Sequence, residues 1–278
     1  MAKQPIVAIL YDFDKTLCSE DMQNYSLIPA LGMTPAEFWS LTNDFTIKEG
    51  VERILSYMYM MVKIAKEKGI KLTKEYLRSL GKDIHYFDGV KEWFGRINEY
   101  GNSLGITVEH YIVSSGTKEI IEGSDIADQF KAIYGCEFMF DKVSKEPLWP
   151  KLAINYTMKT QYFFRIAKGV TRQIDDHLVN ERSKDKRIPY RNIIYIGDGL
   201  TDVPPMILVK ENGGKSIAVY SHDNKEHVLP LIEDGRVNYI CKADYRVNSE
   251  LDKVIKLILK QASITEQLLK KEITTINK

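Results

Sequence analysis

Two aspartates, Asp12 and Asp14, stand one residue apart directly after the first apolar run of the chain, residues 6–11. The run has the composition of a buried β-strand, and residues i and i+2 of a strand point to the same side. Two carboxylates in one site repel each other unless a cation or a proton relieves the repulsion. The pair therefore predicts a divalent metal site, acid–base chemistry or both. The simpler alternative is a pair of loop acids that cap a helix.

Two further apolar runs, residues 108–113 and 193–196, also end in residues that could bind or react with a ligand. A lysine lies between these runs, at the start of a helix-like stretch. In chain order, the residues that could take part are Ser114, Ser115, Gly116, Lys159, Asp198 and Asp202. Open α/β sheets bind ligands at the carboxyl ends of their strands. We therefore expect one sheet edge to gather both pairs of aspartates together with the serine.

The order and context of these groups resemble the four motifs of the haloacid dehalogenase-like (HAD) hydrolase superfamily. Asp12-Phe13-Asp14-Lys15-Thr16 is similar to the first motif, Ile112-Val113-Ser114 to the second, Lys159 to the third, and Gly197-Asp198 with Asp202 to the fourth. The matched motifs span residues 6–203. Strand-like and helix-like runs alternate along the chain, which favours a parallel sheet. The resemblance implies an α/β fold: a three-layer, Rossmann-like parallel sheet core with a helical cap inserted after the first strand.

The resemblance also implies separate roles for the acids. Asp12 would attack phosphorus and form an aspartyl-phosphate. Asp14 would protonate the leaving oxygen and later activate water. Mg²⁺ would be held by Asp12, Asp198 and the backbone carbonyl of Asp14, with Asp202 either binding it directly or lying just behind these ligands.

By the same resemblance, the phosphate group would be bound by Ser114, by the backbone N–H groups of Ser115 and Gly116, and by Lys159. A fixed positive charge is needed there because the nucleophile and the substrate are both anionic. Lys151 and Lys168 are alternatives to Lys159 as the source of that charge.

The second aspartate distinguishes the reactions found within the superfamily. Dehalogenases attack carbon and lack a counterpart of Asp14, so this residue argues against dehalogenation. Phosphoserine phosphatases are the most similar in layout. The sequence therefore predicts a Mg²⁺-dependent hydrolase of a small phosphate monoester. Two alternatives stay open: a phosphotransferase or phosphomutase that uses the same intermediate, and a non-catalytic phosphate-binding protein.

About ninety residues separate the first two strands, where a single crossover helix would need only about a dozen or two. We expect residues 18–84 to form the helical cap, with helices at 21–31, 35–45, 50–67 and 73–81, and residues 1–17 and 85–278 to form the core domain. Candidates for substrate specificity in the cap are Glu20, Asp21 and Arg53. Phosphoserine phosphatases place a glutamate near this position to hold the substrate amine. Capping of a helix by Asp21 and a solvated Arg53 are the simpler alternatives.

The remaining elements follow from local patterns. Strands are expected at 6–12, 108–114, 131–137, 193–197 and 216–220, and helices at 89–100 and 251–269. The proline-containing and aromatic segment 139–156 is expected to form a hairpin beside the sheet.

Composition limits the other function classes. Of the 278 residues 44% are hydrophobic and the net charge is +1, so nothing favours nucleic acid or an acidic membrane as a partner. No apolar stretch approaches the ~20 residues needed to span a bilayer, and the N-terminal residues leave no room for a signal peptide. The three scattered cysteines are expected to be reduced. We therefore expect a cytoplasmic monomer or homodimer whose partner is a small-molecule phosphate ester.

Overall fold

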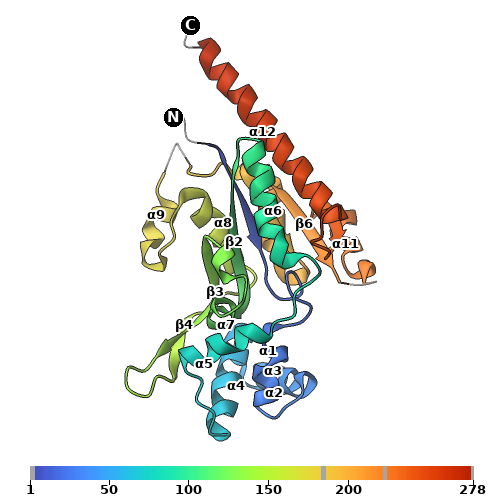
Figure 1. Cartoon of the computed structure of the whole chain (residues 1–278). Helices are drawn as coiled ribbons and strands as arrows, with labels where there is room; N and C mark the ends of the chain where they lie inside the picture. The colour runs from blue at the N-terminus through green and yellow to red at the C-terminus, as the bar shows by residue number, and fades with distance from the viewer. Residues whose placement is uncertain (1–3, 183–185, 222–223, 277–278) are drawn as a thin grey trace.

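The computed structural model describes residues 4–182, 186–221 and 224–276. Within these ranges the strands form one seven-stranded sheet in the order β4-β3-β2-β1-β5-β6-β7 (Figure 1). Neighbouring strands are parallel except for β4, which runs antiparallel to β3. The strands are β1 (Ile6–Tyr11), β2 (Thr107–Thr117), β3 (Ala132–Phe140), β4 (Pro147–Leu152), β5 (Ile193–Gly197), β6 (Lys215–Tyr220) and β7 (Tyr239–Lys242). This topology confirms the predicted parallel α/β core.

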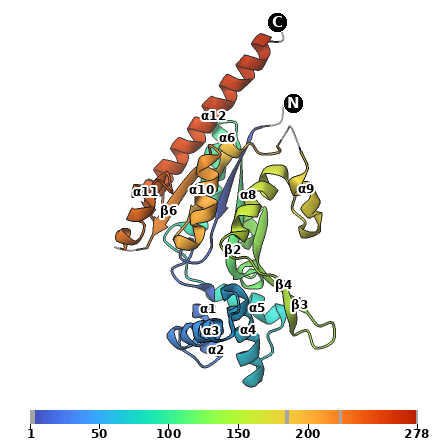
Figure 2. The same ribbon diagram turned by 180° about the vertical axis from the view of Figure 1, so that it is seen from behind.

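Helices cover both faces of the sheet, which gives the predicted three layers. α6 (Val90–Ser103) and α12 (Glu250–Ile276) lie on the face seen in Figure 1. α8 (Met158–Lys168) and α10 (Val203–Glu211) lie on the other face, seen in Figure 2. None of the helices in the described ranges is long and apolar enough to cross a membrane. The shorter elements of the core are α7 (Lys118–Glu122), α9 (Asp176–Asn180), α11 (Leu229–Glu233), η2 (Ala127–Gln129), η3 (Gln173–Asp175), η4 (Tyr190–Asn192), η5 (Leu200–Asp202) and η6 (Lys225–His227).

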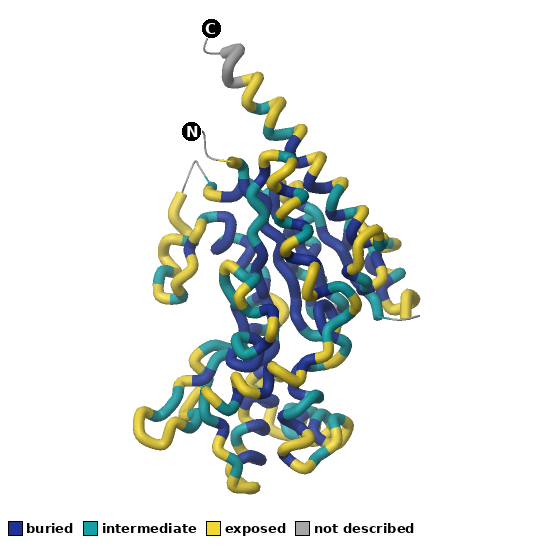
Figure 3. Tube along the Cα trace, viewed as in Figure 1, coloured by how far each residue is buried: buried dark blue, intermediate teal, exposed yellow. Residues whose placement is uncertain are grey.

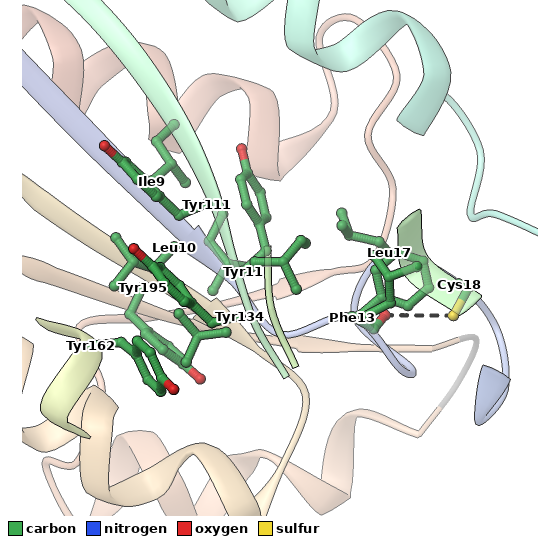
Figure 4. Packing of buried hydrophobic residues seen from close by; sticks show 14 of the residues in the cluster. Ile9, Leu10, Tyr11, Phe13, Leu17, Cys18, Tyr111, Tyr134, Tyr162 and Tyr195 are labelled. Atoms are coloured by element: carbon green, nitrogen blue, oxygen red, sulfur yellow. Dashed lines mark hydrogen bonds between the residues drawn. The ribbon is translucent and has the colours of Figure 1, made fainter. Parts of the chain in front are cut away.

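The central strand β1 is buried along its whole length, as its unbroken apolar sequence predicts for a strand covered on both faces. Figure 3 shows that buried residues concentrate in the sheet and in the helix faces that meet it. Figure 4 shows aromatic rings packed around β1, among them Tyr11 and Tyr195. The Tyr11 hydroxyl accepts a hydrogen bond from Trp93 Nε1 (2.9 Å) and lies 3.0 Å from His110 Nδ1. Burial lowers the pKa of His110 to about 3, so this histidine is a neutral residue of the core.

A group of short helices is inserted between β1 and β2 and packs beyond the carboxyl ends of the strands (Figure 1). The best defined start is that of α3, where Thr34 and Glu37 form a reciprocal capping box. The chain enters and leaves the insert side by side, because Ser19 N–H donates to the His85 carbonyl and Cys18 pairs with Tyr86. The insert consists of α1 (Met22–Tyr25), α2 (Leu27–Ala30), α3 (Pro35–Glu49), α4 (Arg53–Glu67), α5 (Lys74–Ser79) and η1 (Leu80–Asp83).

Some elements differ from the predictions. The single helix predicted at 21–31 is two short helices, because the backbone at Ser26 leaves the helical region (φ −135°). The hairpin predicted at 139–156 begins earlier, since its first strand is the continuation of β3. The short edge strand β7 was not predicted, and α12 runs beyond the predicted 251–269. β2 continues through Thr117, with a shift of its register after Val113, so the Ser114-Ser115-Gly116 segment lies in the strand rather than in a loop after it.

Candidate active site

The chain turns sharply after β1 and leaves Asp12 and Asp14 at the carboxyl edge of the sheet. Asp12 is 6% exposed, and its N–H donates to the carbonyl of Ile196 on β5 (2.9 Å), which fixes it between two strands. The turn then folds back on Phe13, whose carbonyl accepts hydrogen bonds from Leu17 N–H and from the Cys18 thiol at 3.5 Å (Figure 4). The first motif is thus a compact turn with little freedom to move.

Three carboxylates meet at this edge: those of Asp12, Asp198 and Asp202 offer oxygens that lie within 4.8 Å of one another. Asp202 comes close because residue 197 is glycine; a Cβ at Gly197 would lie 2.5 Å from the carboxyl carbon of Asp202. Burial, and then the charges of Asp202 and Asp12, raise the pKa of Asp198 well above its usual range. Within the described residues, the buried Oδ2 atom of Asp202 has no hydrogen-bond partner.

Lys159 supplies a positive charge to this cluster. Its Nζ lies 2.7 Å from Asp202 Oδ1 and 3.1 Å from Asp12 Oδ1, and the side chain is buried. The lysine sits in the first turn of α8, where the side chain of Asn155 accepts a hydrogen bond from Met158 N–H. Burial by itself would lower the pKa of Lys159, but the two carboxylates outweigh it and raise the pKa.

The two alternative lysines lie elsewhere. Lys151 pairs with Glu137 on the hairpin, and Lys168 donates to the carbonyls of Val179 and Glu181. The structure therefore brings Lys159, and neither alternative, to the nucleophile predicted from the first motif.

The pKa of Asp12 stays above its usual range despite this lysine. Burial, and then the charge of Asp202, raise the pKa of Asp12 to about 6, while Lys159 acts in the opposite direction. Tyr195, a residue that the sequence analysis did not single out, donates its hydroxyl proton to Asp202 Oδ1 at 2.7 Å. Tyr195 lies inside the apolar run of β5, so its sequence context gave no signal for a role beyond core packing.

Asp14 is held by the insert. Its Oδ1 accepts a hydrogen bond from the backbone N–H of Met22, the first residue of α1, at 2.7 Å. Burial, and then the charges of Asp21 and Asp12, raise the pKa of Asp14 well above its usual range. The protonated form that a general acid needs is therefore favoured in this position.

The Ser114-Ser115-Gly116 segment borders the same edge. Ser114 is buried and its Oγ accepts the N–H of Gly116 at 2.9 Å, so this N–H is engaged within the segment in the described conformation. The Ser115 carbonyl accepts the hydroxyl of Tyr57 from α4 at 2.7 Å. The Ser115 Oγ is buried and has no partner among the described residues. A side chain at residue 116 would clash, because its Cβ would lie 2.9 Å from Asp14 Oδ2.

A cavity of about 370 Å³ lies between this edge and the insert. Arg53 borders it, and the Arg53 guanidinium donates to Asn43 Oδ1 at 3.2 Å. Asp21 also borders it, but Glu20 does not, and the Glu20 carboxylate accepts a hydrogen bond from Asn24. The lining residues are Asp14, Asp21, Gln23, Trp39, Thr42, Asn43, Thr46, Arg53, Ile54, Tyr57, Ser115, Gly116, Tyr156 and Thr201. Trp39 was not singled out from the sequence, and for Tyr57 core packing was favoured over a place in a substrate cleft, because its spacing on α4 is equally that of a core residue.

Comparison with known proteins agrees with this architecture. No family model matches the chain. An uncharacterised protein of Borreliella burgdorferi is 27% identical over 275 residues, which is 90% of this chain and 95% of that protein. A HAD-family hydrolase of Salmonella enterica serovar Typhi superimposes with a TM-score of 0.59 at 16% identity, over 93% of this chain and 73% of that one.

A phosphoserine phosphatase, solved as an analogue of its phospho-aspartyl intermediate, superimposes with a TM-score of 0.53 at 16% identity, over 92% of this chain and 99% of that one. The chain thus has the fold of HAD-like hydrolases, as its motifs predict. At such low identity the likeness establishes the fold alone, and the chemistry must be argued from the site.

Proposed function

We propose that this protein is a Mg²⁺-dependent phosphomonoesterase of a small phosphorylated metabolite and that it works through an aspartyl-phosphate on Asp12. One observation carries the proposal: a buried cluster of Asp12, Lys159 and Asp202 lies next to Asp14, and Asp14 lines a cavity of about 370 Å³. A nucleophile, a fixed cation and a proton donor are what phosphoryl transfer requires.

The residues at the sheet edge fit a magnesium ion. Their donor atoms are all oxygens, which Mg²⁺ prefers. Three carboxylates face one another, Lys159 contacts two of them, and the buried Oδ2 of Asp202 has no partner within the described residues. Asp12, Asp198 and Asp202, with the backbone carbonyl of Asp14, would hold the ion. When bound, it would offset the repulsion between the anionic nucleophile and the phosphate.

The chain's own residues account for both halves of the reaction. The Asp12 carboxylate attacks phosphorus while Asp14 gives its proton to the leaving oxygen; Asp14 then takes a proton from water, which attacks the aspartyl-phosphate and releases phosphate. Lys159 holds Asp12 in place and, with the Ser114 segment, offsets the charge of the phosphoryl oxygens. The phosphoserine phosphatase that was solved as a phospho-aspartyl analogue supports this route by likeness of fold.

We place substrate selection in the insert at 18–84. Of the three candidates there, Arg53 and Asp21 border the cavity, while Glu20 lies outside its lining. The one hydrogen bond that the structure gives the Arg53 guanidinium, within the described residues, goes to the neutral amide of Asn43. Arginine pairs well with planar oxyanions, so Arg53 can hold a carboxylate of the leaving group.

The test is hydrolysis of p-nitrophenyl phosphate, with phosphate release as the readout. We expect activity that needs Mg²⁺ and is lost on addition of EDTA. Asp12→Asn keeps the size of the side chain and removes the nucleophile, so it should lower kcat/KM at least about a thousandfold while the far-UV circular dichroism stays unchanged. Transfer of phosphate to an added alcohol without release would favour the phosphotransferase alternative. Binding of phosphate esters without turnover would favour the binding protein.

A further inference from the structure

An ion pair joins the catalytic loop to the insert. Lys15 follows Asp14, and its Nζ lies 2.8 and 3.0 Å from the two carboxylate oxygens of Asp21. The backbone of Lys15 is left-handed (φ 56°), a conformation that costs free energy in a residue other than glycine. In this conformation the ammonium of Lys15 reaches Asp21 of the insert.

The Asp21 side chain pairs with Lys15 and does not cap the helix that follows it. It stands at the N-cap of α1, but its side chain accepts no backbone hydrogen bond there, so helix capping does not explain the residue. Both of its carboxylate oxygens are engaged by the ammonium of Lys15. The pair is partly exposed, with 45% of the Lys15 side chain and 29% of the Asp21 side chain accessible.

The charged residues of the cavity lining are Asp14, Asp21 and Arg53. Asp14 is the proposed proton donor and already accepts the Met22 N–H. Asp21 is thus the lining carboxylate that could receive an ammonium group of a substrate. In this structure the chain's own ammonium, that of Lys15, occupies that carboxylate. A second ammonium there would meet a like charge and a carboxylate whose two oxygens each already accept a hydrogen bond from Lys15.

We propose that Lys15 makes the enzyme select phosphate esters whose leaving group carries no amine, such as phosphorylated hydroxy acids, over phosphorylated amino acids and amino alcohols. This selection rests on the proposed phosphatase function. Arg53 remains able to take a carboxylate of such a leaving group, while Lys15 fills the place of the amine.

Two compounds with the same carbon skeleton test the selection. O-phosphoserine carries an ammonium where 3-phosphoglycerate carries a hydroxyl, and both have one carboxylate. They are compared as substrates and as competitive inhibitors of p-nitrophenyl phosphate hydrolysis. For the unmodified protein we expect 3-phosphoglycerate to be favoured at least about tenfold, as like-charge juxtaposition predicts.

Lys15→Asn removes the ammonium and tolerates the left-handed backbone. It should shift the preference at least about tenfold toward O-phosphoserine, because Asp21 is then free to hold the substrate amine. Lys15→Gly, which also accepts this backbone, is the second variant and should shift the preference in the same direction. Lys91→Met, which breaks the exposed ion pair with Asp125, is the matched control and should leave the preference unchanged.

The outcomes separate this proposal from the proposed function. Hydrolysis of p-nitrophenyl phosphate together with a preference of the unmodified protein for O-phosphoserine would overturn the role of Lys15 and leave the phosphatase function standing. A preference that both folded Lys15 variants leave unchanged would do the same. Absence of Mg²⁺-dependent hydrolysis of the aryl phosphate would overturn the function, and the selection with it.

Discussion

The proposed nucleophile, Asp12, must be anionic at a place where burial favours the neutral acid. Burial and the charge of Asp202 raise its pKa to about 6, and Lys159 opposes both effects. Lys159 contacts the carboxylates of both Asp12 and Asp202, so these two buried side chains share one ammonium. Removal of one partner from a buried group of charges lowers the free energy of unfolding more than loss of a surface ion pair does.

Replacement of Lys159 by methionine tests this dependence. The variant keeps the bulk of the side chain but leaves Asp12 and Asp202 without their cation, so the free energy of unfolding should fall by about 3–5 kcal/mol at pH 7. Mg²⁺ should restore part of this loss, since it would bind the same carboxylates in the folded state alone. Urea titrations with and without Mg²⁺ measure both effects.

The matched control is Lys151→Met, which removes an exposed lysine paired with Glu137 and should cost no more than about 1 kcal/mol. Two results would contradict the role given to Lys159: equal losses of unfolding free energy in the two lysine variants, or a Lys159 variant whose stability Mg²⁺ does not change.

Asp14 can be separated from Asp12 by the choice of leaving group. Burial, and then the charges of Asp21 and Asp12, raise the pKa of Asp14, which favours the protonated form that donates. Asp14→Asn should lower turnover of an alkyl phosphate by about 10²–10⁴-fold. Attack on an aryl phosphate, whose leaving group needs little protonation, should fall less and should show a burst of one nitrophenol per protein, because the water attack that follows is also slowed. Stopped-flow absorbance measures the burst. Equal losses for both esters would mean that Asp14 acts chiefly through the geometry of the site.

At this scale the sequence predicted the residues whose position depends only on a strand and its end. Asp12, Asp14 and Asp198 follow apolar runs that could hardly be anything but central strands. It did not single out Tyr195, and for Tyr57 it favoured core packing over a place in a substrate cleft. An aromatic residue in an apolar pattern gives the same signal whether its hydroxyl reaches a partner in the site or packs in the core.

Strands and helices with long apolar patterns could be predicted from the sequence. Elements that form only because a neighbouring strand offers hydrogen bonds could not. β1 and β5 lie between two other strands and are buried throughout, so composition alone indicates them. β7 has four residues, of which only Cys241 is buried, and it exists because β6 offers it hydrogen bonds. The C-terminal helix α12 contacts α6 and the edge strand β7.

The start of α12 is anchored through Asp252, whose buried carboxylate accepts hydrogen bonds from Arg96 Nε (3.2 Å), Lys256 Nζ (2.8 Å) and Asn248 N–H (3.0 Å). Burial raises the pKa of this carboxyl, but these donors outweigh it and the pKa is lowered overall. A carboxyl whose pKa folding lowers stabilises the folded state above its unfolded pKa of about 4, and this contribution is lost as the pH falls through the lower, folded pKa.

Asp252→Asn should therefore lower the free energy of unfolding by about 1.5–3 kcal/mol at pH 7, and the difference from the unmodified protein should shrink as the pH falls below about 4. Denaturant titrations at pH 7 and pH 3 give the two values. The control, Asp125→Asn, breaks an exposed pair with Lys91 and should change stability little at either pH. A loss at pH 3 as large as that at pH 7 would show that the carboxylate charge is not what anchors the helix.

For the molecule as a whole, the sequence predicted an insert that is joined near the nucleophile loop and lies over the site, but not the contacts that its helices would make. Helical periodicity shows which face of a helix is buried and leaves open what buries it. Among the hydrogen bonds that join the insert to the core, two lie at the site: Met22 N–H donates to Asp14 and the Tyr57 hydroxyl donates to the Ser115 carbonyl, each at 2.7 Å. Residues of both the insert and the core line the cavity, so its shape could not be predicted from the sequence of either part alone.

Gly116 is the place where this contact between insert and core can be disturbed by one methyl group. A Cβ there would overlap Met22 Cε and lie 2.9 Å from Asp14 Oδ2. Gly116→Ala should push Met22 away, weaken its hold on Asp14 and lower kcat/KM for an alkyl phosphate at least about tenfold, since small displacements of a catalytic group are costly.

Met22→Ala removes the methionine tip that the new methyl group would strike. In the Met22→Ala background, Gly116→Ala should therefore lower kcat/KM much less than it does alone. The double-mutant cycle should give a coupling free energy of at least about 1 kcal/mol. Gly95→Ala on α6, where a Cβ would meet nothing within 4 Å, is the control and should leave kcat/KM unchanged. An undiminished cost in the double variant would mean that crowding of Asp14 by the methyl group, rather than displacement of the insert, limits the reaction.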